Sequence, residues 1–198
     1  VPSRYEEACR RISSPKNITV DLGTIEYSDN GSRKERVFVN FAGMGFDAEI
    51  VRRTTRNFKA LGSTLSYMLG VFTTLLSYRN REIRVVIDGE ESVKKSCAVV
   101  VNNGKYAGGG MFAAPDADLH DGLLNIMEIG DVSKADLLRS LPLIYKGTHG
   151  KHKKVTLRTA REIEIHSEHL FNLQADGELL GNLPVRFRVV PSALNIIV

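Results

Sequence analysis

Two dipeptides, Asn30-Gly31 and Asp88-Gly89, constrain the fold of this chain more than any other feature. Both central residues of a type I′ turn need a positive φ, which glycine adopts freely and asparagine or aspartate at small cost. Each dipeptide stands between runs that alternate apolar and polar residues, 24–28 and 36–41 for the first, 81–87 and 92–101 for the second. Such alternation is typical of half-buried strands, so the sequence predicts two β-hairpins.

The rest of the chain adds strands and only a few helices. Further strand-like runs recur at 123–129, 155–159, 162–166, 171–175, 185–190 and 194–198. Helical patterns occupy 5–12, 63–76 and about 133–145, the last opened by Ser133 and Asp136 in a likeness of a capping box. Short turns, many strands and no alternating βαβ units predict a mainly β (α+β) fold, an antiparallel β-sandwich with a few inserted helices.

Length and composition fit a single domain over residues 1–198. The two cysteines, Cys9 and Cys97, are far apart, which favours reduced thiols and a cytoplasmic location. The longest nearly apolar stretch, 67–76, is much shorter than the ~20 residues that a membrane-spanning helix needs. We therefore expect no membrane span, while peripheral contact with a membrane surface stays open.

The net charge of +4 is unevenly distributed. Positions 146 to 161 carry no acid and six basic residues: Lys146, Lys151, Lys153, Lys154, Arg158 and Arg161. Such a block is either a solvated face or a patch that meets anionic headgroups at a membrane surface. No aromatic residue is interleaved with these cations as a platform for stacking bases, so we expect no nucleic-acid partner.

Three segments carry residue types that are able to do chemistry. The glycine run 108–110 either lets a ligand approach the backbone closely or forms a flexible loop. The segment 116–121 carries three acids, which suit a hard cation or are simply solvated beside an Asp-Gly turn. The Asp-Gly-Glu sequence at 176–178 is either a hairpin turn or a carboxylate site at a strand end.

Taken together and in order, these segments resemble one family. Residues 37–49, Val-Phe-Val-Asn-Phe-Ala-Gly-Met-Gly-Phe-Asp-Ala-Glu, are similar to the "N-x-A-G-x-G-F-D-A" segment of diacylglycerol kinases and related soluble lipid kinases. Residues 108–123 resemble the glycine-rich signature of that family, and 176–178 match its Asp-Gly-Glu. Residues 21–23, Asp-Leu-Gly, match a "D-x-G" segment, so the likeness runs over nearly the whole chain.

The resemblance implies a fold and a reaction. Members of this family are two-domain enzymes whose N-terminal domain binds ATP with a Gly-Gly-Asp-Gly-Thr loop, which this sequence lacks. The chain is therefore expected to be the substrate-side β-sandwich domain alone, without kinase turnover of its own. The implied reaction is the ATP-dependent, Mg²⁺-assisted phosphorylation of the hydroxyl of diacylglycerol or a related lipid, which gives a phosphatidate.

The resemblance also assigns catalytic roles to single residues. Glu178 matches the general base that takes the proton from the lipid hydroxyl, and Asp176 is its motif neighbour and the second choice. Asp21 matches a carboxylate of an aspartate–water–magnesium network. The glycine run is expected to contribute to cofactor binding through Gly108, Gly109 and Gly110.

One further assignment concerns a metal. Asp121, with the main-chain carbonyls of Asp118 and Leu123, matches a structural Mg²⁺ site of some family members. The sequence departs from the family at Leu124-Asn125, where members often have Leu-Asp, and this departure bears on the choice of lipid more than on the class.

Two other functions stay open at this point. A non-catalytic lipid-binding β-sandwich would need no ATP-binding loop, and an NAD-kinase-like enzyme would share the β-rich C-terminal domain. The expected partners are a diacylglycerol-like lipid and a membrane surface, and a homodimer stays open. An apolar pocket for acyl chains is expected between the sheets or beside the 63–76 helix.

Overall fold

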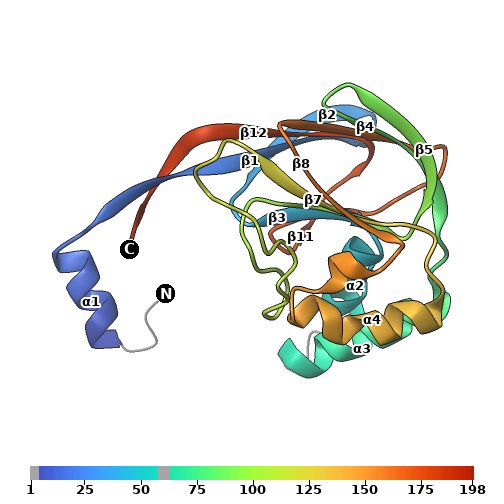
Figure 1. Cartoon of the computed structure of the whole chain (residues 1–198), viewed down its shortest axis with the longest axis horizontal. Helices are drawn as coiled ribbons and strands as arrows, with labels where there is room; N and C mark the ends of the chain where they lie inside the picture. Colours follow the sequence, from blue (N-terminus) through green and yellow to red (C-terminus); the bar gives the residue numbers. More distant parts are fainter. Residues whose placement is uncertain (1–4, 58–62) are drawn as a thin grey trace.

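The computed structural model describes residues 5–57 and 63–198. Two antiparallel sheets of six strands each pack face to face, and helices cover the outer face of one of them (Figure 1). Sheet A consists, in order, of β2 (Ser32–Phe38), β1 (Asn17–Asp29), β12 (Asn182–Ile197), β9 (Glu162–His166), β4 (Arg81–Ile87) and β5 (Glu90–Ser96). Sheet B consists of β11 (Glu178–Leu179), β10 (Leu173–Ala175), β3 (Phe41–Gly45), β6 (Ala98–Asn102), β7 (Leu124–Ile129) and β8 (Val155–Ala160). The predicted β-sandwich is confirmed.

Both predicted hairpins are present. The turn between β1 and β2 places Asn30 at φ 50° and Gly31 at φ 79°. The turn between β4 and β5 places Asp88 at φ 46° and Gly89 at φ 91°. These are the positive values that a type I′ turn requires, so local chemistry alone determines both turns.

The main core fills the space between the two sheets. Inward-facing side chains of both sheets meet there, and Phe38 of β2 packs edge-to-face on Phe187 of β12 with ring centroids 6.4 Å apart. Other fully buried members of this core are Ile25, Met44, Ile83, Leu124, Ile126, Ile163, Ile165 and Leu173. Side chains of both sheets occupy this space, and the apolar pocket described below lies beside the helices, which is the second of the two expected places.

Two runs that the sequence treats as single strands each pass from one sheet to the other. The run 92–101 leaves sheet A at the end of β5 and enters sheet B as β6, with Cys97 at the crossing. The backbone N–H of Cys97 donates to the carbonyl of Ile129, 2.8 Å away, which ties the crossing to β7. The run 36–41 is likewise divided between β2 and β3. Apolar content is similar in both sheets, so periodicity alone does not reveal a change of sheet.

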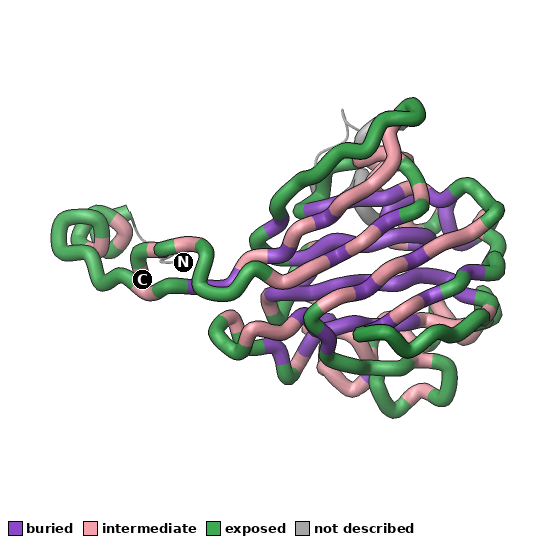
Figure 2. The backbone as a smooth tube through the Cα atoms, turned by 90° about the horizontal axis from the view of Figure 1, so that it is seen from above, coloured by how far each residue is buried: buried purple, intermediate pink, exposed green. Residues whose placement is uncertain are grey.

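The far ends of β1 and β12 form a two-stranded arm that leaves the sandwich (Figures 1 and 2). The arm ends in α1 (Tyr5–Ser13), which is a predicted helix. The runs 185–190 and 194–198, predicted as two strands, are one strand here. Ser192 takes a φ of 51° between them, and the pairing with β1 resumes beyond this irregularity.

Three helices form a third layer on the outer face of sheet B (Figure 1). Two of them are predicted: α3 (Ser63–Ser77), and α4 (Lys134–Tyr145), whose N-cap Ser133 accepts from the backbone N–H of Asp136. The third, α2 (Phe46–Asn57), is not predicted, because residues 37–49 give no helical periodicity before the strand β3 ends. Among the described residues, no helix has both the length and the apolar character needed to cross a bilayer.

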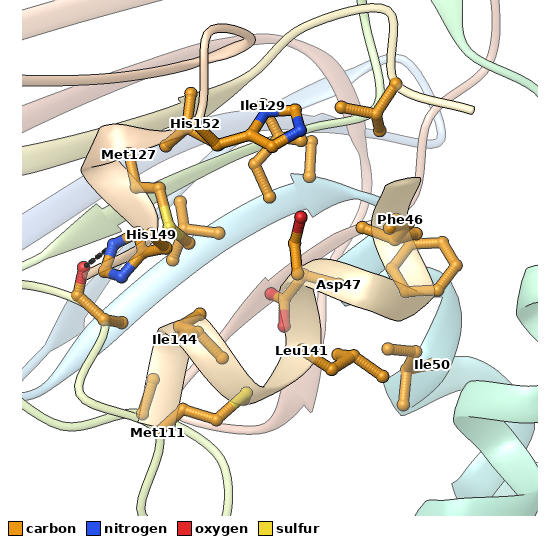
Figure 3. A pocket seen from close by; sticks show the side chains of 18 of the residues that line it. Phe46, Asp47, Ile50, Met111, Met127, Ile129, Leu141, Ile144, His149 and His152 are labelled. Carbon is orange, nitrogen blue, oxygen red and sulfur yellow. Dashed lines mark hydrogen bonds between the residues drawn. The ribbon is translucent and has the colours of Figure 1, made fainter. Parts of the chain in front are cut away.

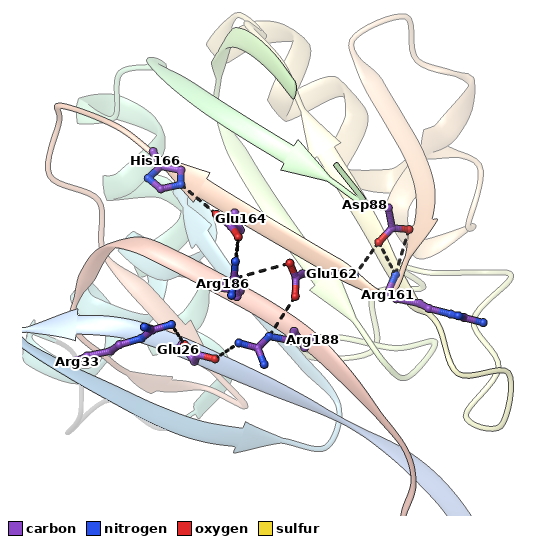
Figure 4. Close-up of polar contacts among 9 residues, drawn as sticks. All are labelled: Glu26, Arg33, Asp88, Arg161, Glu162, Glu164, His166, Arg186 and Arg188. Atoms are coloured by element: carbon purple, nitrogen blue, oxygen red, sulfur yellow. Dashed lines mark hydrogen bonds and ion pairs between the residues drawn. The ribbon is translucent and has the colours of Figure 1, made fainter. Parts of the chain in front are cut away.

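The outer face of sheet A is polar (Figure 4). Arg188 pairs with Glu26 of β1 and, at 3.1 Å, with Glu162 of β9, and Arg186 pairs with Glu164. Exposed pairs of this kind contribute at most about 1 kcal/mol each, so they mark a solvated face more than a source of stability. The apolar outer surface therefore belongs to sheet B, under the helices.

Candidate functional site

An apolar pocket lies between the outer face of sheet B and the helices α2 and α4 (Figure 3). Its lining comes mainly from aliphatic, aromatic and methionine side chains, among them Phe46, Val100, Met127, Leu141, Ile144 and Val155. The helix α3 contributes Val71, in agreement with the expectation of a pocket beside the 63–76 helix. A concave apolar surface with few polar groups is typical of a site for an apolar ligand.

The polar groups of the pocket are few. Asp47, in the first turn of α2, is the only acid among the described residues that line it. Burial raises the pKa of the Asp47 carboxyl to about 6, against the smaller, lowering effect of a hydrogen bond from Gln174. His149 and His152 also line the pocket. His149 is buried and its Nε2 lies 3.1 Å from the carbonyl oxygen of Ala113, while burial lowers its pKa.

Hydrogen bonds connect this pocket to the Asp-Gly-Glu turn. The Nε2 of Gln174 donates to Oδ2 of Asp47 at 2.6 Å, and the Oε1 of Gln174 accepts from the backbone N–H of Gly177 at 3.0 Å. Gln174 is fully buried and lies opposite Gly43 in the β3–β10 pair. A Cβ at Gly43 would lie 2.8 Å from Oδ2 of Asp47, so only glycine leaves room for the carboxyl group. Close packing against Asp47 therefore explains the glycine of the "A-G" pair in the family segment.

Asp176 holds backbone in place. Its carboxylate accepts from the N–H groups of Val39 at 2.7 Å, Asn40 at 3.1 Å and Phe41 at 3.0 Å, where the chain crosses from β2 to β3. Asp88, in the other Asp-Gly turn, accepts from backbone N–H groups at the start of β9 in the same way. Because the same turn chemistry recurs where no function is expected, these contacts assign Asp176 a positioning role.

Glu178 lies on the other side of sheet B from the pocket. It pairs with Ala175 across β10 and β11, and Ala175 faces the core between the sheets. Residues directly opposite each other in a sheet point to the same face, whereas Gln174 points to the pocket face. The Glu178 carboxylate is exposed at the sheet edge and pairs with Arg36 of β2. The predicted base and the pocket are therefore linked through the turn and do not share a cavity.

Asp21 is buried, with 1 % of its surface exposed. Its two carboxylate oxygens accept from the backbone N–H groups of Gly122 and Ser192, each at 2.7 Å. Two residues further on, a Cβ at Gly23 would lie 2.0 Å from the ring of Phe38. Both ends of the Asp-Leu-Gly segment are thus needed for the fold.

Asn103 brings the separate motifs together. Its fully buried side chain donates from Nδ2 to the carbonyl oxygens of Asp21 at 2.9 Å and Val39 at 2.8 Å. Asp176 accepts a hydrogen bond from the backbone N–H of the same Val39. The structure thereby places Asp21, the β2–β3 crossing and the Asp-Gly-Glu turn in one cluster.

The loop of the predicted Mg²⁺ site joins this cluster through Asp21. Asp121 is exposed, and its Oδ1 accepts from the N–H of Leu123 at 2.9 Å. Asp118 accepts from the ring Nδ1 of His120 at 3.0 Å, a bond that lowers the pKa of the Asp118 carboxyl. In the part of the chain that is described, no three His, Cys, Asp or Glu side chains gather as metal ligands. The expected site needs one carboxylate and two carbonyls, so it stays a prediction.

The glycine run forms a tight loop beside the pocket. Gly108, Gly109 and Gly110 have φ values of 23°, 75° and 89°, which other residues rarely adopt. The flanking residues Ala107 and Met111 pair with each other and line the pocket. The role of this run in cofactor binding stays a prediction.

The helical layer exposes both apolar and basic side chains. Large apolar side chains that stand in solvent are Phe72 and Leu76 on α3 and Leu138 and Tyr145 on α4. All six basic residues of the 146–161 block are exposed. Arg158 lies 3.8 Å from Glu90, and Lys154 donates to the carbonyl of Asp131. Lys146, Lys151 and Lys153 have no acidic partner among the described residues.

Sequence reasoning did not single out Asp47, Gln174 or Asn103. Asp47 directly follows the run Phe41–Phe46, which is buried throughout. A carboxyl group at the end of such an apolar run was a signal of a functional residue in the sequence. The role of Gln174 depends on a partner 127 residues away, which no local pattern reveals.

Comparison with known proteins agrees with this architecture. Residues 40–198 match the family described as "YegS C-terminal NAD kinase beta sandwich-like domain". A diacylglycerol kinase of Mycobacterium tuberculosis is 32% identical over 180 residues, which cover 90% of this chain and 57% of that protein. The structure of a diacylglycerol kinase from Bacillus anthracis superposes with a TM-score of 0.64 at 19% identity, over 100% of this chain and 60% of that one.

A more distant likeness concerns the fold alone. Yeast NADH kinase superposes with a TM-score of 0.51 at 11% identity, over 94% of this chain and 45% of that one. This chain therefore spans about half to three-fifths of the length of these proteins. The family match covers four-fifths of the chain in one unbroken stretch, 40–198. The chain belongs to the family of YegS C-terminal NAD kinase beta sandwich-like domains.

Proposed function

We propose that this chain is the lipid-binding domain of an ATP-dependent lipid kinase, which phosphorylates the hydroxyl group of diacylglycerol or a related lipid to give a phosphatidate. The observation that carries the proposal is the apolar pocket on sheet B, joined by hydrogen bonds to the turn that carries Glu178. The ATP-binding domain is a separate part in this proposal, and the 198 residues have no turnover alone.

In the proposed reaction, Glu178 takes the proton from the lipid hydroxyl as it attacks the γ-phosphate. A general base must be accessible and reach its proton within hydrogen-bond distance. Glu178 is exposed and rests against Arg36, so the carboxylate has to leave this cation or act beside it. Asp176 supports the base by fixing the turn against the β2–β3 crossing.

Mg²⁺ suits the exposed 118–123 loop, because Asp121 and the carbonyls of Asp118 and Leu123 offer only oxygen ligands. When bound there, the ion would stabilise the loop that Asp21 holds from the other side through Gly122. Asp21 itself has both oxygens occupied by backbone donors, so its support for any metal is indirect.

The same proposal includes contact with a membrane surface. The exposed apolar residues of α3 and α4 lie on the helical layer that covers the pocket, and Lys146, Lys151 and Lys153 follow α4 in the chain. Cations near an anionic surface contribute about 1 kcal/mol each, and apolar side chains add to the binding when they enter the headgroup region. A lipid would then pass from the bilayer to the pocket without crossing water.

The experiment is phosphate transfer from labelled ATP by the protein that includes its nucleotide-binding domain. Diacylglycerol, a sphingoid base, phosphatidylglycerol, undecaprenol and NAD are the acceptors, with the isolated 198-residue chain in parallel. We expect phosphorylated lipid from the two-domain protein only. Glu178→Gln should lower the rate by about 10² or more, as for other general bases, while the exposed Glu168→Gln should not.

Other outcomes contradict parts of the proposal. Transfer to NAD and to no lipid would favour an NAD kinase. Lipid binding without transfer to any acceptor would favour a non-catalytic lipid-binding module. Full activity of Glu178→Gln would remove the assignment of the base.

A further inference from the structure

A second cavity opens at the edge of the helical layer, where α2 and α3 approach the start of β4. Three arginines from separate elements line it: Arg53 of α2, Arg79 of the loop after α3, and Arg81 of β4. The cavity has no lining residue in common with the apolar pocket on sheet B. Its volume of about 460 Å³ is many times the ~30 Å³ of a water molecule, so it has room for a polar ligand.

The charges in this cavity are not balanced. Glu49 is the only acid among the described residues that line it. Its carboxylate already accepts hydrogen bonds of 2.6–2.8 Å, and the donors are Arg52, Arg53 and Asn172. Three guanidinium groups and one carboxylate leave the lining with two more positive than negative charges. Like charges that share a cavity repel each other, so an anion in this place would be stabilised.

Arg53 is held in place before any ligand binds. Its Nε donates to Oε1 of Glu49 at 2.7 Å, and its Nη1 donates to the carbonyl oxygen of Thr73 at 3.1 Å. These two bonds tie α2 to α3 and fix the plane of the guanidinium group. Arginine presents a planar fork of donors that matches the oxygens of a phosphate group. A fork that is already fixed loses less conformational entropy when it binds a ligand.

The cavity also contains a donor without an acceptor. The hydroxyl of Tyr78 is buried and has no hydrogen-bond partner in the described part of the chain. The Tyr78 ring packs edge-to-face on Phe46, with ring centroids 5.6 Å apart. Burial raises the pKa of Tyr78, against the smaller, lowering effect of the Arg81 charge, so the hydroxyl keeps its proton and is able to donate. A buried donor without a partner is costly, so this hydroxyl points to an acceptor from outside the protein.

We infer that the three arginines of this cavity and the Tyr78 hydroxyl form a binding site for a phosphate group. Phosphate supplies both the negative charge and the acceptor oxygens that the lining lacks. Leu170, 81% exposed, lines the same cavity, so a phosphate that carries an acyl chain would gain an apolar contact beside it. The inference goes beyond the proposed function, because it needs neither the apolar pocket nor Glu178.

The test follows the phosphate itself by ³¹P NMR during titration with the 198-residue chain. Inorganic phosphate and dihexanoyl phosphatidate are the two ligands, which distinguishes a free phosphate from a lipid headgroup. Each titration is repeated with an excess of dihexanoylglycerol, which has no phosphate and competes for any apolar lipid site. We expect saturable binding of inorganic phosphate that dihexanoylglycerol does not reduce.

Single substitutions identify the site. Loss of one hydrogen bond to a charged acceptor corresponds to about tenfold in Kd. Arg79→Gln, Arg81→Gln and Tyr78→Phe should therefore each weaken the binding of inorganic phosphate about tenfold, and Tyr78→Phe does so without removing the ring. Lys151→Gln and Lys153→Gln remove the same charge from the exposed basic block, and each should change Kd less than about twofold at physiological salt.

The two sources of phosphate give different results. Tighter binding of dihexanoyl phosphatidate, with the advantage lost in Leu170→Ser, would identify a lipid headgroup as the ligand. Equal affinity for both ligands would identify a free phosphate, and either result supports the site. No saturable binding of either ligand, unchanged binding in Arg79→Gln, Arg81→Gln and Tyr78→Phe, or equal losses in the lysine variants would overturn the inference. Phosphate transfer to a lipid does not depend on this outcome, so the proposed function is tested separately.

Discussion

Asp21→Asn should destabilise the protein even in the absence of any metal. The native carboxylate lies in a buried position and accepts two backbone N–H groups, from Gly122 and Ser192, each at 2.7 Å. Asparagine has only one acceptor oxygen, so one of these donors would face an NH₂ group and remain unpaired. The replacement keeps the volume of the side chain, so it changes hydrogen bonding and charge without leaving a cavity.

The expected magnitude follows from these two contacts. A hydrogen bond to a charged acceptor contributes about 1.5–3 kcal/mol, and a buried donor left without a partner costs about 1–3 kcal/mol. With partial relaxation of the 119–122 loop, we expect a loss of about 3 kcal/mol in the free energy of unfolding. For a chain of this size, 1 kcal/mol corresponds to roughly 2–4 °C, so Tm should fall by about 6–12 °C.

The assay is urea unfolding followed by circular dichroism, with EDTA in one series and Mg²⁺ in the other. The slope of the transition should not change, because the native and unfolded states expose the same surfaces. Asp116→Asn, at an exposed position, should change stability by less than about 0.5 kcal/mol. A loss in Asp21→Asn that is below about 0.5 kcal/mol, or that occurs only with Mg²⁺, would refute the structural role of Asp21.

Three further predictions concern other parts of the structure. The native pKa of Asp47 is raised to about 6, so the unfolded state binds fewer protons than the native state between about pH 4 and pH 6. As the pH rises through this range, the wild type should lose stability relative to Asp47→Asn. Above about pH 6 the difference in Tm between the two proteins, measured by thermal unfolding, should stay constant. Leu173→Ala, in the core between the sheets, should cost about 2–5 kcal/mol in urea unfolding, whereas Leu170→Ala, at a position 81% exposed, should cost less than about 0.5; equal costs would contradict the described core. Replacement of Lys146, Lys151 and Lys153 by glutamate should abolish the salt-sensitive sedimentation of the protein with anionic vesicles. The same change at Lys16 and Lys34 should leave this sedimentation intact. The reverse pattern would place the membrane contact elsewhere on the protein.

The local features of the fold can be read from the sequence. The turns at Asn30-Gly31 and Asp88-Gly89 depend on the φ preferences of the residues themselves, and α4 begins at a side-chain cap within three residues. In contrast, the change of sheet at Cys97 depends on a bond to Ile129, which is distant in the sequence. Hydrophobic periodicity shows which face of a strand is buried, but it does not show to which of the two sheets the strand belongs.

The site likewise combines features that local sequence predicts with features that depend on distant residues. Asp21, Asp176 and Glu178 are found from short motifs, and the structure connects Asp21 with Asp176 through Asn103 and Val39. The motifs do not reveal that the carboxylates of Asp21 and Asp176 accept hydrogen bonds from backbone N–H groups. The pocket is built from side chains of strands, helices and loops that are far apart along the chain, so no single segment has its pattern. The helix α2, which carries Asp47, is stabilised by packing on sheet B and lacks a clear signal of its own.

In the proposed function, the pocket on sheet B holds the acyl chains of a lipid. The most direct measurement uses diacylglycerol with a photoreactive group in one acyl chain, crosslinked to the chain and mapped by mass spectrometry. We predict adducts on Met111, Met127, Leu141 and Ile144, which excess dioctanoylglycerol prevents. Adducts spread over the polar face of sheet A, or adducts that excess lipid does not reduce, would contradict the account.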